Sequence, residues 1–242
     1  MIVVLTHSLL AGEIKVAVAA NVSYAIEDLK KEFSKLHPDT KVQVILGSSG
    51  KLTAQIKHGA PYDLFMSANM MYPNALYKEG IATTKPVIYA QGCLAYFSSK
   101  KQDFRDGMKL LQNEDIDKIA TANPKTAPYG IAAAEAMKSA KVYESVKKKF
   151  VFGESISQTV SYAVSATDIG LIAKSSLYSA KMAHFKEGIH WADVDVSLYT
   201  PINQGIVILK KRESESEVLD FYDFILSEKA QKIFKSFGYL LP

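Results

Sequence analysis

Short apolar runs alternate with amphipathic segments along most of the chain. Ile14, Val16 and Val18 recur at the two-residue period of a strand, and apolar side chains in residues 22–36 recur at the spacing of one helix face. The same order of strand and helix returns several times downstream. Such alternation is typical of an α/β protein whose strands form a parallel sheet.

The same two periods predict the remaining elements. Strands are expected at residues 42–46, 63–67, 87–97, 119–122, 150–151, 169–173 and 206–209. Helices are expected around residues 52–58, 131–137, 160–164, 218–225 and 230–234, with residues 239–241 packing after the last of them. The sequence has no repeat of fixed period and no low-complexity linker, so any two lobes must be joined through strands.

Composition excludes several classes of partner and cofactor. The 242 residues, 48% of them hydrophobic, can bury one large core or two smaller ones. The net charge is +4 and basic residues are scattered, apart from residues 147–149, which we interpret as a solvated helix face. No nucleic-acid partner is therefore expected. Cys93, the only cysteine, excludes an intramolecular disulfide and leaves the redox compartment open.

The first residues resemble a shortened secretory signal. Residues 2–5 and 9–11 are apolar, but His7 and Ser8 interrupt them and no basic residue precedes them, so the segment alone leaves secretion open. No run in the sequence reaches the ~18 apolar residues that a transmembrane helix needs. We expect residues 1–12 to be a vestigial or truncated signal segment and the mature protein to be soluble.

Four loops of small residues each follow a predicted strand and precede a helix. They are residues 20–23, 47–50, 127–130 and 154–157. The first turn of a helix carries N–H donors without intrahelical acceptors and the positive end of the helix dipole, so it stabilises an anion. Helix starts of this kind lie at the carboxyl ends of parallel strands, where ligand crevices form. The loops together predict an anion site, although ordinary capping explains any one of them.

Three stretches resemble the periplasmic molybdate-binding proteins of ABC importers. They are VAVAAN at residues 16–21, GSSGKLTAQI at residues 47–56 with GAPYDLFMSA at residues 59–68, and SEKAQKIFKSFG at residues 227–238. The likeness extends from about Glu13 to Pro242. It implies a type II periplasmic binding protein fold, which is an α/β architecture of two lobes with mixed, mostly parallel sheets and a ligand cleft between the lobes.

The resemblance also implies a function. The chain would be the soluble, periplasmic substrate-binding component of an ABC transporter, without a cofactor or enzymatic activity, that captures molybdate and tungstate for a membrane permease and acts as a monomer. The oxyanion contacts would be Asn21, Ser49, Tyr129 and Ile156, with Ala20 as an additional contact through its backbone. Tyr129 and Ile156 would donate their N–H groups. Molybdenum or tungsten would be bound only as the oxyanion, through these same residues.

Two positions depart from one branch of that family. Asn21 stands where a serine is common, and Ala173 stands where a ligand-contacting tyrosine occurs, which removes one hydroxyl donor. Another branch has the asparagine and a tyrosine in the third loop, as here. We expect lobe 1 to comprise residues 13–89 and 203–242 and lobe 2 to comprise residues 90–202, with strands crossing between them.

The ligand class follows from the donors. A pocket of donors alone suits a fully deprotonated dianion, because a protonated oxyanion would bury an unsatisfied O–H at a cost of about 1–3 kcal/mol. Glu154 is the only acidic residue in the four loops and the one possible acceptor. Phosphate is therefore disfavoured, whereas a sulfate-type oxyanion-binding protein and a ligand-sensing module stay as alternatives. Leu52 follows Lys51 where a phosphate loop needs Ser or Thr, and the histidines lack partner motifs, so no enzyme is expected.

Overall fold

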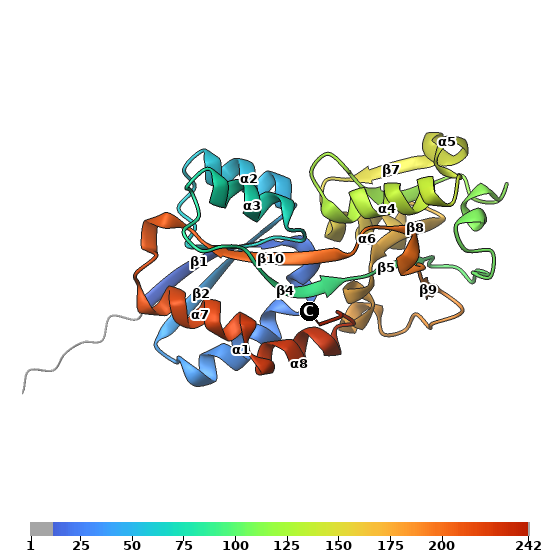
Figure 1. Ribbon diagram of the computed structural model, residues 1–242. Coiled ribbons are helices and arrows are strands. Elements are labelled where there is room, and N and C mark those ends of the chain that lie inside the picture. Colours follow the sequence, from blue (N-terminus) through green and yellow to red (C-terminus); the bar gives the residue numbers. More distant parts are fainter. Residues whose placement is uncertain (1–11, 242) are drawn as a thin grey trace, which may run out of the picture.

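The computed structural model describes residues 12–241 and contains two five-stranded sheets, each covered by helices (Figure 1). We call the sheet that contains the first strand, with its helices, lobe 1, and the other sheet with its helices lobe 2. The predicted signal segment falls on residues 1–12, of which residues 1–11 lie outside the described residues. Gly12, which that prediction included, is the first residue of strand β1.

Lobe 1 is a sheet between two layers of helices. Its strands, in spatial order, are β2 (Thr40–Gly47), β1 (Gly12–Ala19), β3 (Leu64–Met66), β10 (Ile202–Ile208) and β4 (Val87–Gly92). Its helices are α1 (Ile26–Leu36), α2 (Ser49–Lys57), α3 (Met71–Lys78), α7 (Ser216–Leu226) and α8 (Glu228–Ser236). Alternation along β1 buries Ile14, Val16 and Val18 against α1, α7 and α8, and turns Ala17 toward α2 and α3 (Figure 1).

Lobe 2 has the same construction. Its strands, in spatial order, are β7 (Phe150–Gly153), β6 (Ile119–Ala122), β8 (Ile169–Ala173), β5 (Leu94–Phe97) and β9 (Trp191–Asp193), and its helices are α4 (Pro128–Ser139), α5 (Tyr143–Val146) and α6 (Ile156–Ser165). Short 3₁₀ segments complete the chain: η1 (Ala20–Tyr24), η2 (Gly107–Gln112), η3 (Lys147–Lys149), η4 (Lys174–Tyr178), η5 (Ala180–Met182), η6 (Val196–Leu198) and η7 (Lys210–Arg212).

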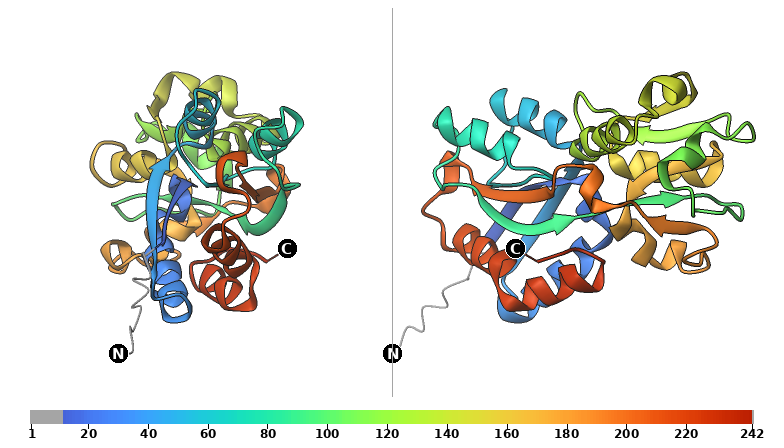
Figure 2. Two further views of the ribbon diagram at one scale, coloured as in Figure 1. Left: turned by 90° about the vertical axis from the view of Figure 1, so that its left-hand side faces the viewer. Right: turned by 45° about the vertical axis from the view of Figure 1, so that its right-hand side comes forward.

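The two lobes are joined through strands. β4 of lobe 1 continues through Cys93 into β5 of lobe 2, and the chain returns from β9 through η6 into β10. β4 and β10 are antiparallel neighbours and run side by side in green and orange in Figure 2. The expected strand over residues 87–97 is thus two strands in two sheets. The residue limits predicted for the lobes stay a prediction; the predicted boundaries fall within β4 and β10, two strands of the lobe 1 sheet.

The sheets are mixed, as predicted, although parallel pairings do not outnumber antiparallel ones. β1 and β6 pair in parallel with both neighbours, whereas β10 and β5 pair antiparallel with both of theirs. The antiparallel strands are those next to the crossings, because each enters its sheet from the other lobe. Leu36, Leu240 and Leu241, expected to pack, are exposed. Leu240 instead exchanges two backbone hydrogen bonds with Gln91.

Candidate anion-binding site

Four helix starts meet around one small cavity between the lobes. η1 follows β1, α2 follows β2, α4 follows the loop after β6, and α6 follows β7. The cavity is lined by Ala19, Ala20, Asn21, Ser48, Ser49, Ala68, Ala127, Pro128, Tyr129 and Ile156, all of which are buried. The five residues that the sequence suggested as contacts, Ala20, Asn21, Ser49, Tyr129 and Ile156, are all in this lining. Residues that are far apart in the sequence therefore line one cavity.

Backbone N–H groups supply the first set of donors. Ser49 and Ile156 are the first residues of α2 and α6, and Tyr129 is the second residue of α4. Their N–H groups have no acceptor within their own helices, because the first turn of an α-helix lacks preceding carbonyls. The positive ends of three helix dipoles add to the attraction for an anion.

The Ser49 hydroxyl supplies a side-chain donor. Its Oγ accepts a hydrogen bond of 2.9 Å from the N–H of Ala68, which follows β3. A hydroxyl that accepts in this way still has its own proton to donate. Ser49 is almost fully buried, so its hydroxyl proton cannot be donated to bulk solvent.

Ser48 also lines the cavity, although the sequence analysis did not include it among the expected contacts. Its Oγ is buried, and within residues 12–241 it has no hydrogen-bond partner. Ser48 occupies the N-cap position of α2 without making a side-chain cap hydrogen bond. A buried hydroxyl without a partner costs free energy, and the Ser48 Oγ is therefore free to bond a molecule in the cavity. The signal was available, since Ser48 lies inside the GSSG loop.

A buried polar network bonds the side-chain NH₂ and the backbone carbonyl of Asn21. Its Nδ2 donates to Gln204 Oε1 at 2.8 Å and to Tyr239 Oη at 3.0 Å. Its carbonyl accepts from Ser175 Oγ at 3.0 Å and from Tyr239 Oη at 2.9 Å. Its Oδ1 has no partner in the described part of the chain. Gln204, Tyr239 and Ser175 carried no signal in the sequence, because nothing local connects them to the first loop.

The Tyr129 side chain is directed into the protein rather than at a ligand. Its Oη accepts from Gln204 Nε2 at 3.3 Å. Burial raises the pKa of Tyr129 well above its ordinary value, with a smaller contribution from the neighbouring Tyr239, so the hydroxyl stays neutral. Gly92 of β4 makes this position possible, because a Cβ there would overlap Tyr129 Oη and lie 2.7 Å from Gln204 Nε2.

Two residues that the sequence singled out lie elsewhere. Glu154, the one possible acceptor in the loops, places its carboxylate 2.7 Å from Lys51 Nζ across the two lobes and is not in the lining. Ala173 is buried at the end of β8 and is not in the lining either. The lining thus contains no charged side chain. Between residues 12 and 241, no group of three His, Cys, Asp or Glu side chains is placed to hold a metal ion.

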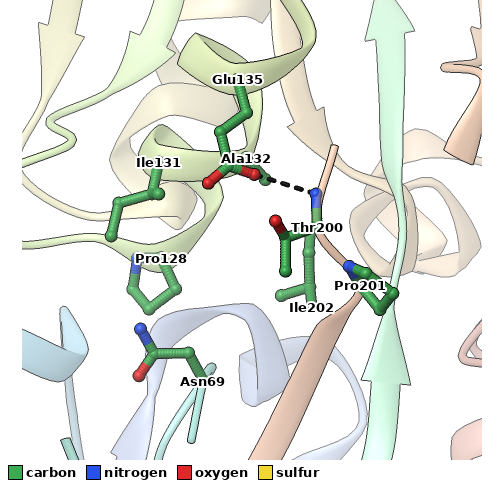
Figure 3. A pocket seen from close by; sticks show the side chains of 8 residues that line it. All are labelled: Asn69, Pro128, Ile131, Ala132, Glu135, Thr200, Pro201 and Ile202. Atoms are coloured by element: carbon green, nitrogen blue, oxygen red, sulfur yellow. Dashed lines mark hydrogen bonds between the residues drawn. The ribbon is translucent and has the colours of Figure 1, made fainter. Parts of the chain in front are cut away.

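An adjoining pocket marks where the gap between the lobes reaches the surface. Its volume is about 110 Å³, and Pro128 lines both this pocket and the buried cavity. Figure 3 shows Asn69 of lobe 1 opposite Pro128, with Thr200 and Ile202 at the side. Glu135 of α4 accepts a hydrogen bond of 2.9 Å from the Thr200 N–H, which ties α4 to the segment before β10 (Figure 3).

These features define a class of protein. Two α/β lobes enclose a small, buried, uncharged cavity whose polar groups are chiefly hydrogen-bond donors, which is the construction of a protein that binds an anion. No helix within the described residues is both long and apolar enough to cross a bilayer.

Comparison with known proteins identifies the family. The sequence model of the bacterial extracellular solute-binding proteins matches residues 14–240. The molybdate-binding protein ModA of Azotobacter vinelandii is 35% identical over 234 residues, which are 95% of this chain and 90% of the relative. The protein of the same name from Rhodobacter capsulatus is 34% identical, over 95% of this chain and 89% of its own length.

A solved structure agrees with the sequence relatives. The periplasmic molybdate-binding protein of Azotobacter vinelandii superposes with a TM-score of 0.85 at 30% identity, over 95% of this chain and 99% of its own. The chain therefore belongs to the bacterial extracellular solute-binding proteins, in the branch of the molybdate-binding proteins. This confirms the predicted two-lobed fold, the binding rather than enzymatic class, and the periplasmic location.

Proposed function

We propose that this protein is the substrate-binding component of an ABC importer and that it captures molybdate, and tungstate as well, in the buried cavity. The observation that carries the proposal is the convergence of helix-start N–H groups and serine hydroxyls on an uncharged cavity between two lobes. The relatives that are named molybdate-binding proteins support the choice of anion. The membrane permease of the importer is the expected partner, and the protein is expected to act as a monomer.

We assign the oxyanion contacts to Asn21, Ser49, Tyr129 and Ile156, with Ala20 contributing through its backbone. Tyr129 and Ile156 donate backbone N–H groups, since the Tyr129 hydroxyl is bonded to Gln204 and isoleucine has no polar side-chain atom. Ser49 donates through both its N–H and its hydroxyl. Ser48 joins this set, because its buried Oγ has no other partner within residues 12–241. Molybdenum or tungsten is bound only as part of the oxyanion.

The preference for a dianion follows from the charges around the cavity. Molybdate and tungstate are tetrahedral dianions without a proton at neutral pH, so a site of donors satisfies all their oxygens. Hydrogen phosphate carries an O–H that would need an acceptor, and no carboxylate in the described chain lines the cavity to accept it. Sulfate, like molybdate, is a tetrahedral dianion, so its rejection depends on the size of the closed cavity.

The site is expected to work by domain closure. An anion enters while the lobes are apart and contacts the loops of both lobes only when they close. It then stabilises the closed form by its higher affinity for that form. The present structure has the closed arrangement, because its lining residues are buried and lobe 1 contacts lobe 2 through Gly50 and Thr126.

Calorimetric titration of the purified protein with molybdate, tungstate, sulfate and phosphate tests the proposal. We expect tight binding of molybdate and tungstate, weaker binding of sulfate and the weakest binding of phosphate. Tight sulfate binding beside weak molybdate binding would overturn the choice of anion. Absence of binding for all four anions would overturn the assignment of the cavity as an oxyanion site.

A further inference from the structure

The buried side chain of Gln204 connects the cavity to both lobes. Gln204 lies in β10, next to an irregularity in its pairing with β4, and is completely buried. Its Oε1 accepts from Asn21 Nδ2 and from Tyr89 Oη, each at 2.8 Å. Its Nε2 donates to Tyr129 Oη at 3.3 Å. One amide thus contacts the first loop of lobe 1, the core of lobe 1 and the third loop, which belongs to lobe 2.

In this arrangement the amide oxygen of Asn21, and not its NH₂, is left without a partner among the described residues. Its Nδ2 is used by Gln204 and Tyr239, and its Oδ1 is buried without a partner among residues 12–241. Asn21 belongs to the cavity lining, where a free amide oxygen would repel an anion and a free amide NH₂ would donate to it. The buried oxygen is also costly by itself, because it has lost its contact with water without gaining a hydrogen-bond partner in the described chain.

Turning the Asn21 amide alone does not free its NH₂ for an anion. If only its amide turned by half a turn, Oδ1 would face Gln204 Oε1, and two acceptors would meet at 2.8 Å. If Gln204 turns as well, its Nε2 donates to Asn21 Oδ1 and to Tyr89 Oη. The asparagine NH₂ is then free of Gln204 and Tyr239 and can donate to a ligand in the cavity.

The rest of the network accepts this second arrangement without moving a heavy atom. Tyr129 Oη, which was an acceptor, donates to Gln204 Oε1 instead. Tyr89 Oη donates to the Ser67 carbonyl, which lies 3.4 Å away. Tyr239 Oη can turn its proton to Asn21 Oδ1, because Ser175 Oγ still satisfies the Asn21 carbonyl. Hydroxyl groups can exchange the roles of donor and acceptor, and this property lets both amides turn together.

We propose that Asn21 and Gln204 form a coupled amide pair, in which Gln204 is a positioning residue that orients the Asn21 NH₂ toward the bound oxyanion. The inference rests on the proposed function, since it concerns how the same cavity presents its donors. One orientation of the pair offers a donor and suits a dianion. The other offers an acceptor and suits a protonated oxyanion, so Gln204 also contributes to the choice between them.

A double-mutant cycle of Gln204→Met and Asn21→Ala tests the coupling by molybdate titration. Methionine keeps the length of the side chain but can neither donate to Oδ1 nor accept from Nδ2. We expect Gln204→Met alone to raise the Kd about 10-fold, the effect of one lost hydrogen bond to a charged ligand. In the Asn21→Ala background the same substitution should change the Kd less than about 3-fold, because there is no amide left to orient.

Tyr89→Phe tests the pair from the other side: Gln204 Nε2 donates to Tyr89 Oη only in the arrangement that frees the Asn21 NH₂, so loss of this hydroxyl should disfavour that arrangement and raise the Kd. Ser176→Ala is the control, because its buried hydroxyl donates to the Ala173 carbonyl outside this network, and we expect a change in Kd of less than about 3-fold. Side-chain amide signals in ¹H–¹⁵N spectra give a second readout, since molybdate should shift the NH₂ signals of both Asn21 and Gln204.

The outcomes separate the two proposals. If the wild-type protein binds no molybdate, the proposed function fails. If it binds molybdate but Gln204→Met weakens binding equally in both backgrounds, Gln204 acts only through the fold and the coupled pair is wrong. An unchanged Kd in Gln204→Met, or a shift of the Asn21 signal without one of Gln204, overturns the coupled pair as well.

Discussion

At the scale of single residues, the two serines at the start of α2 differ in the hydrogen bonds of their hydroxyls. Ser49 Oγ accepts from the Ala68 N–H, whereas Ser48 Oγ has no partner in residues 12–241. Both are buried, so neither hydroxyl can use bulk water. A ligand that accepts both protons would therefore gain two hydrogen bonds at sites that the fold has already desolvated.

Ser48→Ala and Ser49→Ala should each weaken molybdate binding. A hydrogen bond to a charged group contributes about 1.5–3 kcal/mol, which corresponds to a Kd higher by roughly 10- to 100-fold. Ser48→Ala should leave the thermal midpoint of the ligand-free protein unchanged or raise it, because the Ser48 hydroxyl bonds none of residues 12–241. Titration calorimetry and thermal unfolding measure the two effects.

Ser176→Ala is the control for both serine variants. Ser176 is equally buried, but its Oγ donates to the Ala173 carbonyl at 2.7 Å and it is not in the cavity lining. This substitution should lower stability and leave the Kd unchanged. A normal Kd in Ser48→Ala would remove that residue from the contacts.

Tyr129→Phe should lower the stability of the protein and leave its affinity for molybdate nearly unchanged. The substitution removes the partner of Gln204 Nε2, so we expect a loss of about 1–3 kcal/mol in the free energy of unfolding. The backbone N–H assigned to the ligand is kept, so the Kd should change less than about 3-fold. Denaturant unfolding and molybdate titration give the two values. A large loss of affinity would contradict the assignment of the backbone as the donor.

At the scale of elements, the crossing strands β4 and β10 do more than connect the lobes. Gly92 ends β4 and pairs with Ile202 of β10, and the absence of a side chain at Gly92 gives Tyr129 Oη its place beside Gln204. A loop residue of lobe 2 thus packs directly on a crossing strand. A substitution in β4 should therefore shift the binding loop that carries Tyr129.

Gly92→Ala should lower both the thermal midpoint and the molybdate affinity. The new methyl group would overlap Tyr129 Oη, so either the tyrosine or the strand must shift. The cost of overpacking is typically about 1–3 kcal/mol. The Gly92→Ala, Tyr129→Phe double variant lacks the overlapping oxygen and should recover part of both losses. No recovery in this double variant would show that the effect of Gly92 does not pass through Tyr129.

Periodicity predicted most elements but not all. The strands at residues 119–122 and 169–173 have the predicted limits, because a continuous apolar run bounded by polar residues is a local signal. Helix α3 was not predicted, since it is short and carries Pro73 within it. The run over residues 87–97 was expected as one strand, because nothing local at Cys93 tells that the chain passes from one sheet to the other.

At the scale of the whole molecule, two contacts join the lobes beside the cavity. The Gly50 N–H of α2 donates to the Thr126 carbonyl at 2.9 Å, and a Cβ at Gly50 would come within 2.9 Å of that oxygen. Lys51 and Glu154 form an ion pair of 2.7 Å at the surface. Both contacts join α2 to loops of lobe 2, so both depend on closure and should favour the closed form.

Charge reversal at Lys51 should weaken binding modestly and in a salt-dependent way. In Lys51→Glu two carboxylates face each other when the lobes close, and an exposed pair contributes about 0.2–1 kcal/mol, so we expect a Kd higher by about 2- to 5-fold at low salt. The effect should largely vanish in 1 M salt, where the screening length is about 3 Å. The exchanged variant, Lys51→Glu with Glu154→Lys, should recover the affinity. Failure to recover would mean that Lys51 acts on the anion itself and not through Glu154.

The sequence by itself determined the α/β rhythm, the four loops at strand ends and, through its resemblance to a family, the residues that meet in the cavity. These are local properties, set by side-chain period, by small residues and by the donors of a helix start. Only the tertiary structure decided which polar groups remain free for a ligand. Asn21 is paired with Gln204 from 183 residues away, Ser49 accepts from Ala68, and Glu154 is engaged by Lys51. A hydrogen-bond donor is available only if the fold has given it no other acceptor, and that depends on residues which the chain brings together only when both lobes are formed.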